Sequence, residues 1–305
     1  MAKKKTQNLV IPPQEKCYAF YDLTKKTLEI MASQRGISTL ELKKYYSHTD
    51  QYCDFYDDLS EIPRIFAQML FHVQNATMIS NIVKFKDNYH FLKEITCNFV
   101  PNDFLKKYEN VDSFVNALRY NENSNPNGLV WDSSKSENKD SIAKRFAKAA
   151  FACAEYLNGF SNEEAVLEKL KGVYEDAKND EKKLINYFRS EIKSGFSIAL
   201  TCDFLKEFNE YFEFLPKPDI HIKDAISALN GRVNYYHTES REIDLIKEVQ
   251  KITELINNEL KSKGEIEEIT VYQLDRMIWL ICSGKFFLHD DKYGKGAYIY
   301  EISKL

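Results

Sequence analysis

Apolar residues recur at intervals of three and four along most of this chain, and few glycines or prolines interrupt them. Only 10 of the 305 residues are glycine and 7 are proline, whereas 44% are apolar and 13% are aromatic. Helical spacing with so few turn-forming residues is typical of helices rather than of many short strands. We therefore expect an all-α protein that is long enough to bury a full core in one or two domains.

One segment near the C-terminal end shows a different pattern. The residues GAYIYEIS (296–303) alternate in polarity, which predicts a short strand. Its expected partner is KFFLH (285–289), across the turn-like stretch DDKYGKG. The expected fold therefore contains at most one short C-terminal hairpin besides its helices.

Two capping boxes predict where particular helices begin. Ser161 with Glu164, and Thr270 with Gln273, each have the Ser/Thr-x-x-Glu/Gln spacing in which two side chains satisfy two backbone N–H groups. Both boxes precede apolar residues at helical spacing. We expect a helix to start immediately after Ser161 and another after Thr270.

The overall charge neither favours nor excludes a nucleic-acid partner. The chain has 42 Lys and Arg against 46 Asp and Glu, which gives a net charge of -4. The cationic residues are numerous enough to build a local basic face. Stretches that mix both signs, such as LKEFNEYFEFLPK (205–217), predict solvated faces instead.

Cysteine usage argues against a metal centre. The six cysteines are scattered singly, with no CxxC pair, and several lie in apolar helical patterns where a reduced thiol serves as a small hydrophobe. His289, Asp290 and Asp291 fit either a metal site or, more commonly, a turn. No apolar stretch is long enough for a membrane span. We expect no metal, no cofactor, no membrane partner and a cytoplasmic location.

The segment FLPKPDIHIKDAISAL (214–229) places an aspartate at a defined point. Pro216 and Pro218 each fix their own φ and push the preceding residue towards extended geometry. Apolar residues at helical spacing follow, so Asp219 lies where a helix N-cap belongs. Asp219 is then either a cap alone or a cap whose carboxylate also performs chemistry.

A helix, the short turn KSG (193–195) and a second helix precede this segment. A tight turn between two helices can point backbone N–H groups at a phosphate and grip nucleic acid without reading its sequence. Lys193, Ser194 and Gly195 therefore form either a phosphate clamp or an ordinary helix C-cap with its turn. The aspartate that follows favours the clamp.

This order resembles the helix-hairpin-helix DNA glycosylase superfamily, which contains endonuclease III and 8-oxoguanine glycosylase-like enzymes. EIKSGFSIA (191–199) is similar to the family's hairpin pattern LPGxGxKxA, and KPDIHI (217–222) is similar to its aspartate segment. MLFHVQNATMIS (69–80) resembles the helix end of the family whose glutamine lies in the DNA groove. The resemblance spans residues 62–229.

The resemblance implies a role for each matching residue. Asp219 is the expected catalytic carboxylate, and Gln74 or Asn75 would fill the gap that a flipped base leaves. Ser194, Gly195 and Ser197 match hairpin positions that contact DNA, as does Lys193, which replaces the first hairpin glycine. Because Ser197 stands where bifunctional members carry a Schiff-base lysine, the resemblance implies a monofunctional enzyme. Lys217 and His221 are further expected DNA contacts, although His221 also fits a histidine that is exposed or satisfied in the core.

The reaction that the resemblance implies, hydrolysis of an N-glycosidic bond, can be catalysed by a carboxylate. Hydrolysis of an N-glycosidic bond passes through an oxocarbenium-like sugar, which a fixed carboxylate stabilises while it orients or deprotonates water. The residues Tyr235, Tyr236 and His237 are either a stacking platform for a base or a loop before a helix. The expected partner is double-stranded DNA, and the expected state is a monomer.

The predicted architecture has two helical lobes, one formed by residues 1–61 and 209–305 and the other by residues 62–208. Two other functions fit the same sequence: a DNA-binding protein of this fold without catalysis, and a helical interaction module that does not bind DNA. A basic face formed by Lys193, Lys217 and Lys223 would favour the two DNA-binding interpretations.

Overall fold

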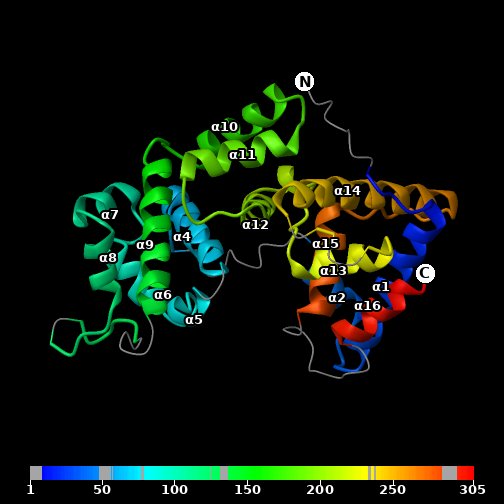
Figure 1. Cartoon of the computed structure of the whole chain (residues 1–305), viewed down its shortest axis with the longest axis horizontal. Coiled ribbons are helices and arrows are strands. Elements are labelled where there is room, and N and C mark those ends of the chain that lie inside the picture. Colours follow the sequence, from blue (N-terminus) through cyan, green and yellow to red (C-terminus); the bar gives the residue numbers. More distant parts are fainter. Residues whose placement is uncertain are drawn as a thin grey trace. The chain divides into compact units, whose positions relative to one another are not determined.

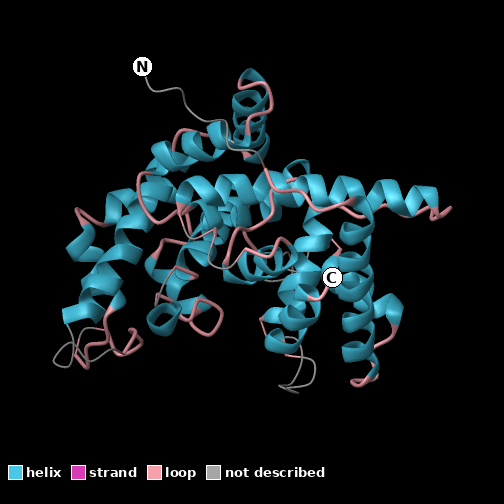
Figure 2. Cartoon of the chain, turned by 45° about the vertical axis from the view of Figure 1, so that its right-hand side comes forward, coloured by secondary structure: helices cyan, strands magenta, loops and turns pink. Residues whose placement is uncertain are grey.

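The computed structural model describes residues 9–47, 56, 58–76, 79–123, 125–130, 137–232, 235–236, 238–283 and 294–305. Figure 2 shows that the regular structure within these residues is helical. Two isolated bridges, Arg119 with Leu129 and Asn121 with Asn125, are the β pairings found there. The all-α class predicted from the sequence is confirmed.

The chain divides into two compact units. Unit 1 comprises Met1–Thr49 and Leu205–Leu305, and unit 2 comprises Asp50–Phe204. The sequence-based lobes had their limits at 61/62 and 208/209, whereas the units have theirs at 49/50 and 204/205. Unit 1 contains both ends of the chain and unit 2 is one continuous segment.

Six helices of unit 1 contribute buried residues to one apolar core. Its helices are α1 (Gln14–Ser33), α2 (Thr39–Tyr46), α13 (Ile220–Leu229), α14 (Glu239–Ser262), α15 (Val271–Cys282) and α16 (Lys295–Ser303), with the 3-10 turn η1 (Glu210–Phe212). Helix α1 packs against α14 and α15, and α13 packs against α15 and α16 (Figure 1). The buried residues of α13 therefore anchor its N-terminal end, where Asp219 lies.

The predicted C-terminal strand is wrong. Residues 296–303 belong to helix α16, whose buried residues Tyr298 and Ile302 are four apart and so lie on one helical face. The hydroxyl of Tyr298 is 2.7 Å from Oγ1 of Thr24 on α1. The expected partner strand, residues 285–289, lies outside the described residues, as do His289, Asp290 and Asp291.

Unit 2 is organised around the long helix α9. Its helices are α4 (Glu61–Gln74), α5 (Ser80–Val83), α6 (Tyr89–Ile95), α7 (Pro101–Lys107), α8 (Val111–Leu118), α9 (Glu137–Leu157), α10 (Glu163–Asp176) and α11 (Glu181–Ile192). Helix α9 packs against α4, α7, α8 and α11. Helix α12 (Ile198–Phe208) begins in unit 2 and ends in unit 1.

One of the two predicted capping boxes is confirmed. The Thr270 side chain accepts from the Gln273 N–H, and the Gln273 side chain accepts from the Thr270 N–H, at the start of α15. The box at Ser161 is wrong by one residue, because Asn162 caps α10 by accepting from the Ala165 N–H at 2.9 Å. Asn is as good an N-cap as Ser, so spacing alone did not separate the two positions.

Candidate functional site

Asp219 is the N-cap of α13, as the sequence predicted. Its backbone is extended, and Oδ1 accepts hydrogen bonds from the N–H groups of His221 at 2.8 Å and Ile222 at 3.3 Å. Pro216 and Pro218 before it are buried. The two prolines and the cap together give this carboxylate one defined position at the end of a helix.

The second carboxylate oxygen of Asp219 has a different environment. Within the described residues, Oδ2 accepts no hydrogen bond, and its one ionic neighbour is Nζ of Lys217 at 4.0 Å. The side chain is 17% exposed. The N-terminal end of a helix stabilises a nearby negative charge. One oxygen of this carboxylate is therefore held by the helix while the other remains available to a ligand.

His221 lies on the first turn of α13, beside Asp219. The ring is half-buried, and its Nδ1 atom is buried without a hydrogen-bond partner among the residues that the structure describes. Burial lowers the pKa of His221, an effect that Asp219 opposes and Lys295 and Lys217 reinforce. His221 therefore favours the neutral form, in which an unprotonated ring nitrogen can accept a hydrogen bond.

The turn between α11 and α12 has two residues in the left-handed region. Lys193 has φ 58° and Gly195 has φ +90°. Lys193 is exposed and forms the C-cap of α11, while the Ser194 N–H donates to the Ile192 carbonyl at 2.7 Å. The backbone therefore adopts a glycine-favoured conformation at both positions, although one of them is occupied by lysine.

The start of helix α12 has backbone N–H groups that donate no hydrogen bond within the described residues. Ser197 is exposed, and its Oγ accepts from the Leu200 N–H at 3.2 Å, so Ser197 caps this helix. In the part of the chain that the structure describes, the backbone N–H groups of residues 195–199 donate no hydrogen bond. Such groups at a helix N-terminus can bind an anion.

The two residues at the end of α4 differ in exposure. Gln74 is 6% exposed, and its Oε1 accepts from the Phe85 N–H at 2.8 Å. Asn75 is the C-cap of α4 and is exposed. Gln74 would have to give up a buried hydrogen bond to enter a DNA groove, whereas Asn75 is already at the surface.

The predicted site residues fall into two groups, one in each unit. In unit 2 the turn of residues 193–195, which joins α11 to α12 and is called the hairpin below, lies close to the end of α4. A Cβ placed at Gly195 would lie 3.1 Å from Cγ2 of Val73, the neighbour of Gln74. Unit 1 brings Lys217 and His221 together with Asp219. Each group forms a local cluster within its own unit.

The three lysines of the expected basic face differ in environment. Lys193 is exposed. Lys217 lies 4.0 Å from the Asp219 carboxylate, and Lys223 donates to Glu242 with both side chains largely buried. Two of the three cations are therefore next to a carboxylate, which reduces their contribution to a positive surface.

Of the two alternatives for residues 235–237, a stacking platform or a loop before a helix, Tyr236 does not fit the stacking platform. Its side chain is fully buried and its hydroxyl donates to Glu248. Tyr235 has the guanidinium carbons of Arg232 and Arg241 each 4.3 Å from its ring centroid. Position 237 lies outside the described residues. The Tyr236 ring cannot stack on a base without leaving the core.

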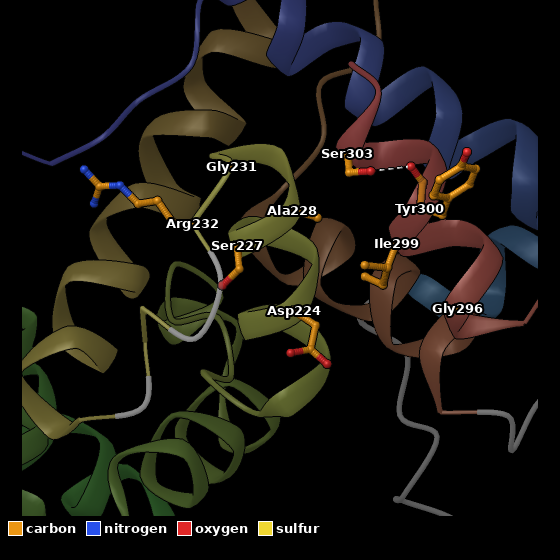
Figure 3. A pocket seen from close by; sticks show the side chains of 9 residues that line it. All are labelled: Asp224, Ser227, Ala228, Gly231, Arg232, Gly296, Ile299, Tyr300 and Ser303. Atoms are coloured by element: carbon orange, nitrogen blue, oxygen red, sulfur yellow. Dashed lines mark hydrogen bonds between the residues drawn. The ribbon is translucent and has the colours of Figure 1, made fainter.

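Unit 1 also contains a pocket of about 450 Å³ between α13 and α16 (Figure 3). Small residues such as Ala228 and Gly296 leave the space, and Ile299 and Tyr300 form an apolar side. Asp224 lies at one end, where it pairs with Lys295 at 2.6 Å. The pocket therefore combines a mainly apolar lining with a carboxylate that is paired with a lysine.

The described residues contain no group of three or more His, Cys, Asp or Glu side chains placed to hold a metal ion. Burial raises the pKa of the Cys17 thiol to about 11 and that of Cys282 to about 12, so both thiols are poor nucleophiles at neutral pH. No helix among these residues combines the length and apolar character needed to cross a bilayer.

Sequence reasoning did not identify Lys206 and Asp275. Lys206 lies in the stretch predicted to be a solvated face, but its side chain is 2% exposed and pairs with Asp275. The two residues are 69 positions apart. Asp275 also contacts the segment that carries Asp219, through the N–H of Lys217.

Comparisons with known proteins identify no relative. No protein-family model, no curated protein and no solved structure matches this chain.

Proposed function

We propose that this chain is a monofunctional DNA N-glycosylase-like protein that hydrolyses the N-glycosidic bond of a damaged or modified base in double-stranded DNA. The observation that carries the proposal is the Asp219 carboxylate. Its Oδ1 is held by two backbone N–H groups, while Oδ2 accepts no hydrogen bond within the described residues. A carboxylate arranged in this way is positioned before the substrate arrives, which is how enzymes stabilise developing charge.

In the proposed reaction the base leaves with the electron pair of the bond between its nitrogen and the sugar carbon. The sugar gains oxocarbenium character, and the Asp219 carboxylate stabilises the positive charge. Water then bonds to the sugar carbon and gives its proton to Asp219 or to the departing base. The products are a free base and an abasic site in an intact strand.

The hairpin supplies the proposed grip on the DNA backbone. Lys193 and Gly195 adopt left-handed conformations, and the N–H groups of residues 195–199, which donate no hydrogen bond among the described residues, can bind a phosphate. Contacts of this kind are independent of base sequence. Ser197 caps α12 and has no amine, which supports hydrolysis without a Schiff-base intermediate.

The gap left by a flipped base requires a side chain at the protein surface. Asn75 meets this requirement, whereas Gln74 is buried and bonded to the Phe85 N–H. We therefore assign the gap-filling role to Asn75 and a structural role to Gln74. His221, with its lowered pKa, is a proposed hydrogen-bond acceptor beside the catalytic carboxylate.

The test uses duplexes that each carry one modified base, followed by hot alkali to cleave abasic sites. Wild-type protein should produce alkali-dependent cleavage on at least one duplex. Asp219→Asn should lose about 100-fold or more of this activity, the scale expected when a group that stabilises developing charge is removed. Asn is a good N-cap, so the variant keeps the start of α13 intact.

A matched control is Asp180→Asn. Asp180 caps α11 and accepts from the Lys182 N–H at 3.0 Å, so the same chemical change is made at a second cap. This variant should excise the base at the wild-type rate. Equal activity of wild type and Asp219→Asn, or no abasic sites on any duplex, would contradict the proposal.

A second candidate function is a helical interaction module without DNA. The observation in its favour is that Lys217 and Lys223 each lie next to a carboxylate, which weakens the expected basic face. Duplex affinity measured at several salt concentrations separates the candidates. A DNA-binding protein loses affinity steeply as salt rises, whereas an interaction module shows no measurable affinity at any salt concentration.

A further inference from the structure

Lys206 and Asp275 form a buried ion pair in unit 1, next to the segment of residues 216–219 that carries Asp219. Nζ of Lys206, near the end of α12, lies 2.5 Å from Oδ2 of Asp275 on α15. Both side chains are 2% exposed, and the Lys206 ammonium is also 5.6 Å from the ring centroid of Tyr272. Burial raises the pKa of Asp275, while the charge of Lys206 opposes that rise.

Stability alone does not account for such a pair. Removing two charges from water is costly, and apolar residues of similar volume often stabilise a core equally well. An apolar pair cannot, however, accept a hydrogen bond. The property that distinguishes Asp275 from a leucine at the same place is its acceptor oxygen.

That oxygen has a second donor. Oδ2 of Asp275 accepts from the backbone N–H of Lys217 at 2.7 Å. Pro216 and Pro218 have no N–H, so Lys217 supplies the one backbone donor of this three-residue segment. Asp275 therefore binds residues 216–218 at Lys217, the one residue of the three whose backbone can donate a hydrogen bond.

The hydrogen bonds continue from Lys217 to the carboxylate. The Asp219 N–H donates to the Lys217 carbonyl at 2.7 Å, and Oδ1 of Asp219 accepts from the first turn of α13. A continuous series of contacts thus leads from the Lys206 ammonium through Asp275 and Lys217 to Asp219. Each contact restricts the backbone that determines where Oδ2 of Asp219 lies.

We infer that Asp275 is a positioning residue for Asp219 and that Lys206 balances its buried charge, an inference that rests on the proposed function. Asp275 holds the Lys217 N–H, and the segment between the two prolines then presents Asp219 in one orientation. The pair does not contact the substrate.

Two double variants separate positioning from stability. K206M/D275N removes both charges and keeps an acceptor oxygen for the Lys217 N–H. K206M/D275L removes both charges and the acceptor. The two variants differ only at position 275, where asparagine and leucine have similar size. A difference in amide protection or in excision rate between them therefore measures the effect of the acceptor oxygen. If the leucine variant does not fold, alanine at 275 in the same background removes the acceptor without the bulk.

The first measurement is hydrogen exchange of the Lys217 amide in the full chain. Selective ¹⁵N labelling of lysine gives the signal, and Lys217→Arg assigns it. Wild type and K206M/D275N should protect this amide, and K206M/D275L should exchange at the rate of an unprotected amide. An unprotected Lys217 amide in wild type, or equal protection in both double variants, would overturn the inference.

The second measurement is the single-turnover rate of base excision. K206M/D275L should be about 100-fold slower than K206M/D275N, the effect expected from a displacement of about 1 Å at a reacting group. Equal rates would overturn the positioning role even if the amide behaves as expected. If wild type excises no base, the proposed function fails, while the exchange measurement still decides whether the pair holds the segment of Asp219.

Discussion

Gly195 lies so close to Ala149 of α9 that a Cβ at position 195 would be 2.5 Å from the Ala149 Cβ. The same Cβ would lie 3.1 Å from Cγ2 of Val73 on α4. The backbone at Gly195 also has φ +90°, which disfavours any side chain. Packing and conformation therefore both require glycine at this point of the hairpin.

Gly195→Ala should lower the free energy of unfolding by about 2–5 kcal/mol, because left-handed strain adds to the overpacking of α9 and α4. The control is Gly36→Ala, since Gly36 has φ +69° but, apart from its chain neighbours, no atom of the described residues lies within 4 Å of the added Cβ. That change should cost only about 1 kcal/mol from strain. Urea unfolding measures both; equal losses would show that the close approach to Ala149 does not matter.

Lys193→Gly should stabilise the chain by about 0.5–1 kcal/mol, because glycine adopts the left-handed conformation of Lys193 without strain. Lys183→Gly is the matched comparison, since Lys183 is an exposed residue inside α11. It should destabilise by about 1 kcal/mol. Thermal unfolding of the two variants should therefore show shifts of opposite sign, and shifts of the same sign would contradict the assigned turn geometry.

Lys206→Met alone should cost about 3–5 kcal/mol, because it leaves the Asp275 carboxylate buried without its cation. The double variant K206M/D275N should recover most of this loss, since it removes the uncompensated charge. Denaturant unfolding of the single and double variants gives the coupling between the two positions. Additive losses would mean that the two side chains do not form a pair in solution.

The histidine beside Asp219 should make stability depend on pH. Burial lowers the pKa of His221 below its usual value of 6.5, so the unfolded chain binds more protons between those two values. The free energy of unfolding should then decrease as the pH falls below 6.5 and level off below the lowered pKa. His221→Gln should weaken this dependence, while His90→Gln, a change at an exposed histidine, should preserve it.

Local signals predicted local structure well. The N-cap at Asp219 and the capping box at Thr270 were readable because each depends on residues within one turn of the helix start. The C-terminal strand was wrong because the alternation covers only eight residues, and a segment this short also fits a helical period. Helix α16 packs against α13, and no local feature of residues 296–303 contains that information.

The environment of single side chains was less predictable. Gln74 is buried and accepts from the Phe85 N–H, a partner outside its own helix. Lys206 was assigned to a solvated face because charges surround it in sequence, yet its partner Asp275 is 69 residues away. Pairings over such distances depend on the packing of helices, which neither composition nor spacing specifies.

The most direct test of the account is to detect free base released from a modified duplex by mass spectrometry, with binding of the same duplex measured in parallel. Wild-type protein should release the base and leave the strand intact until alkali is added. Asp219→Asn should bind the duplex with similar affinity and release no detectable base. Release at the same rate by both proteins, or DNA binding by both without any release, would contradict a catalytic role for Asp219.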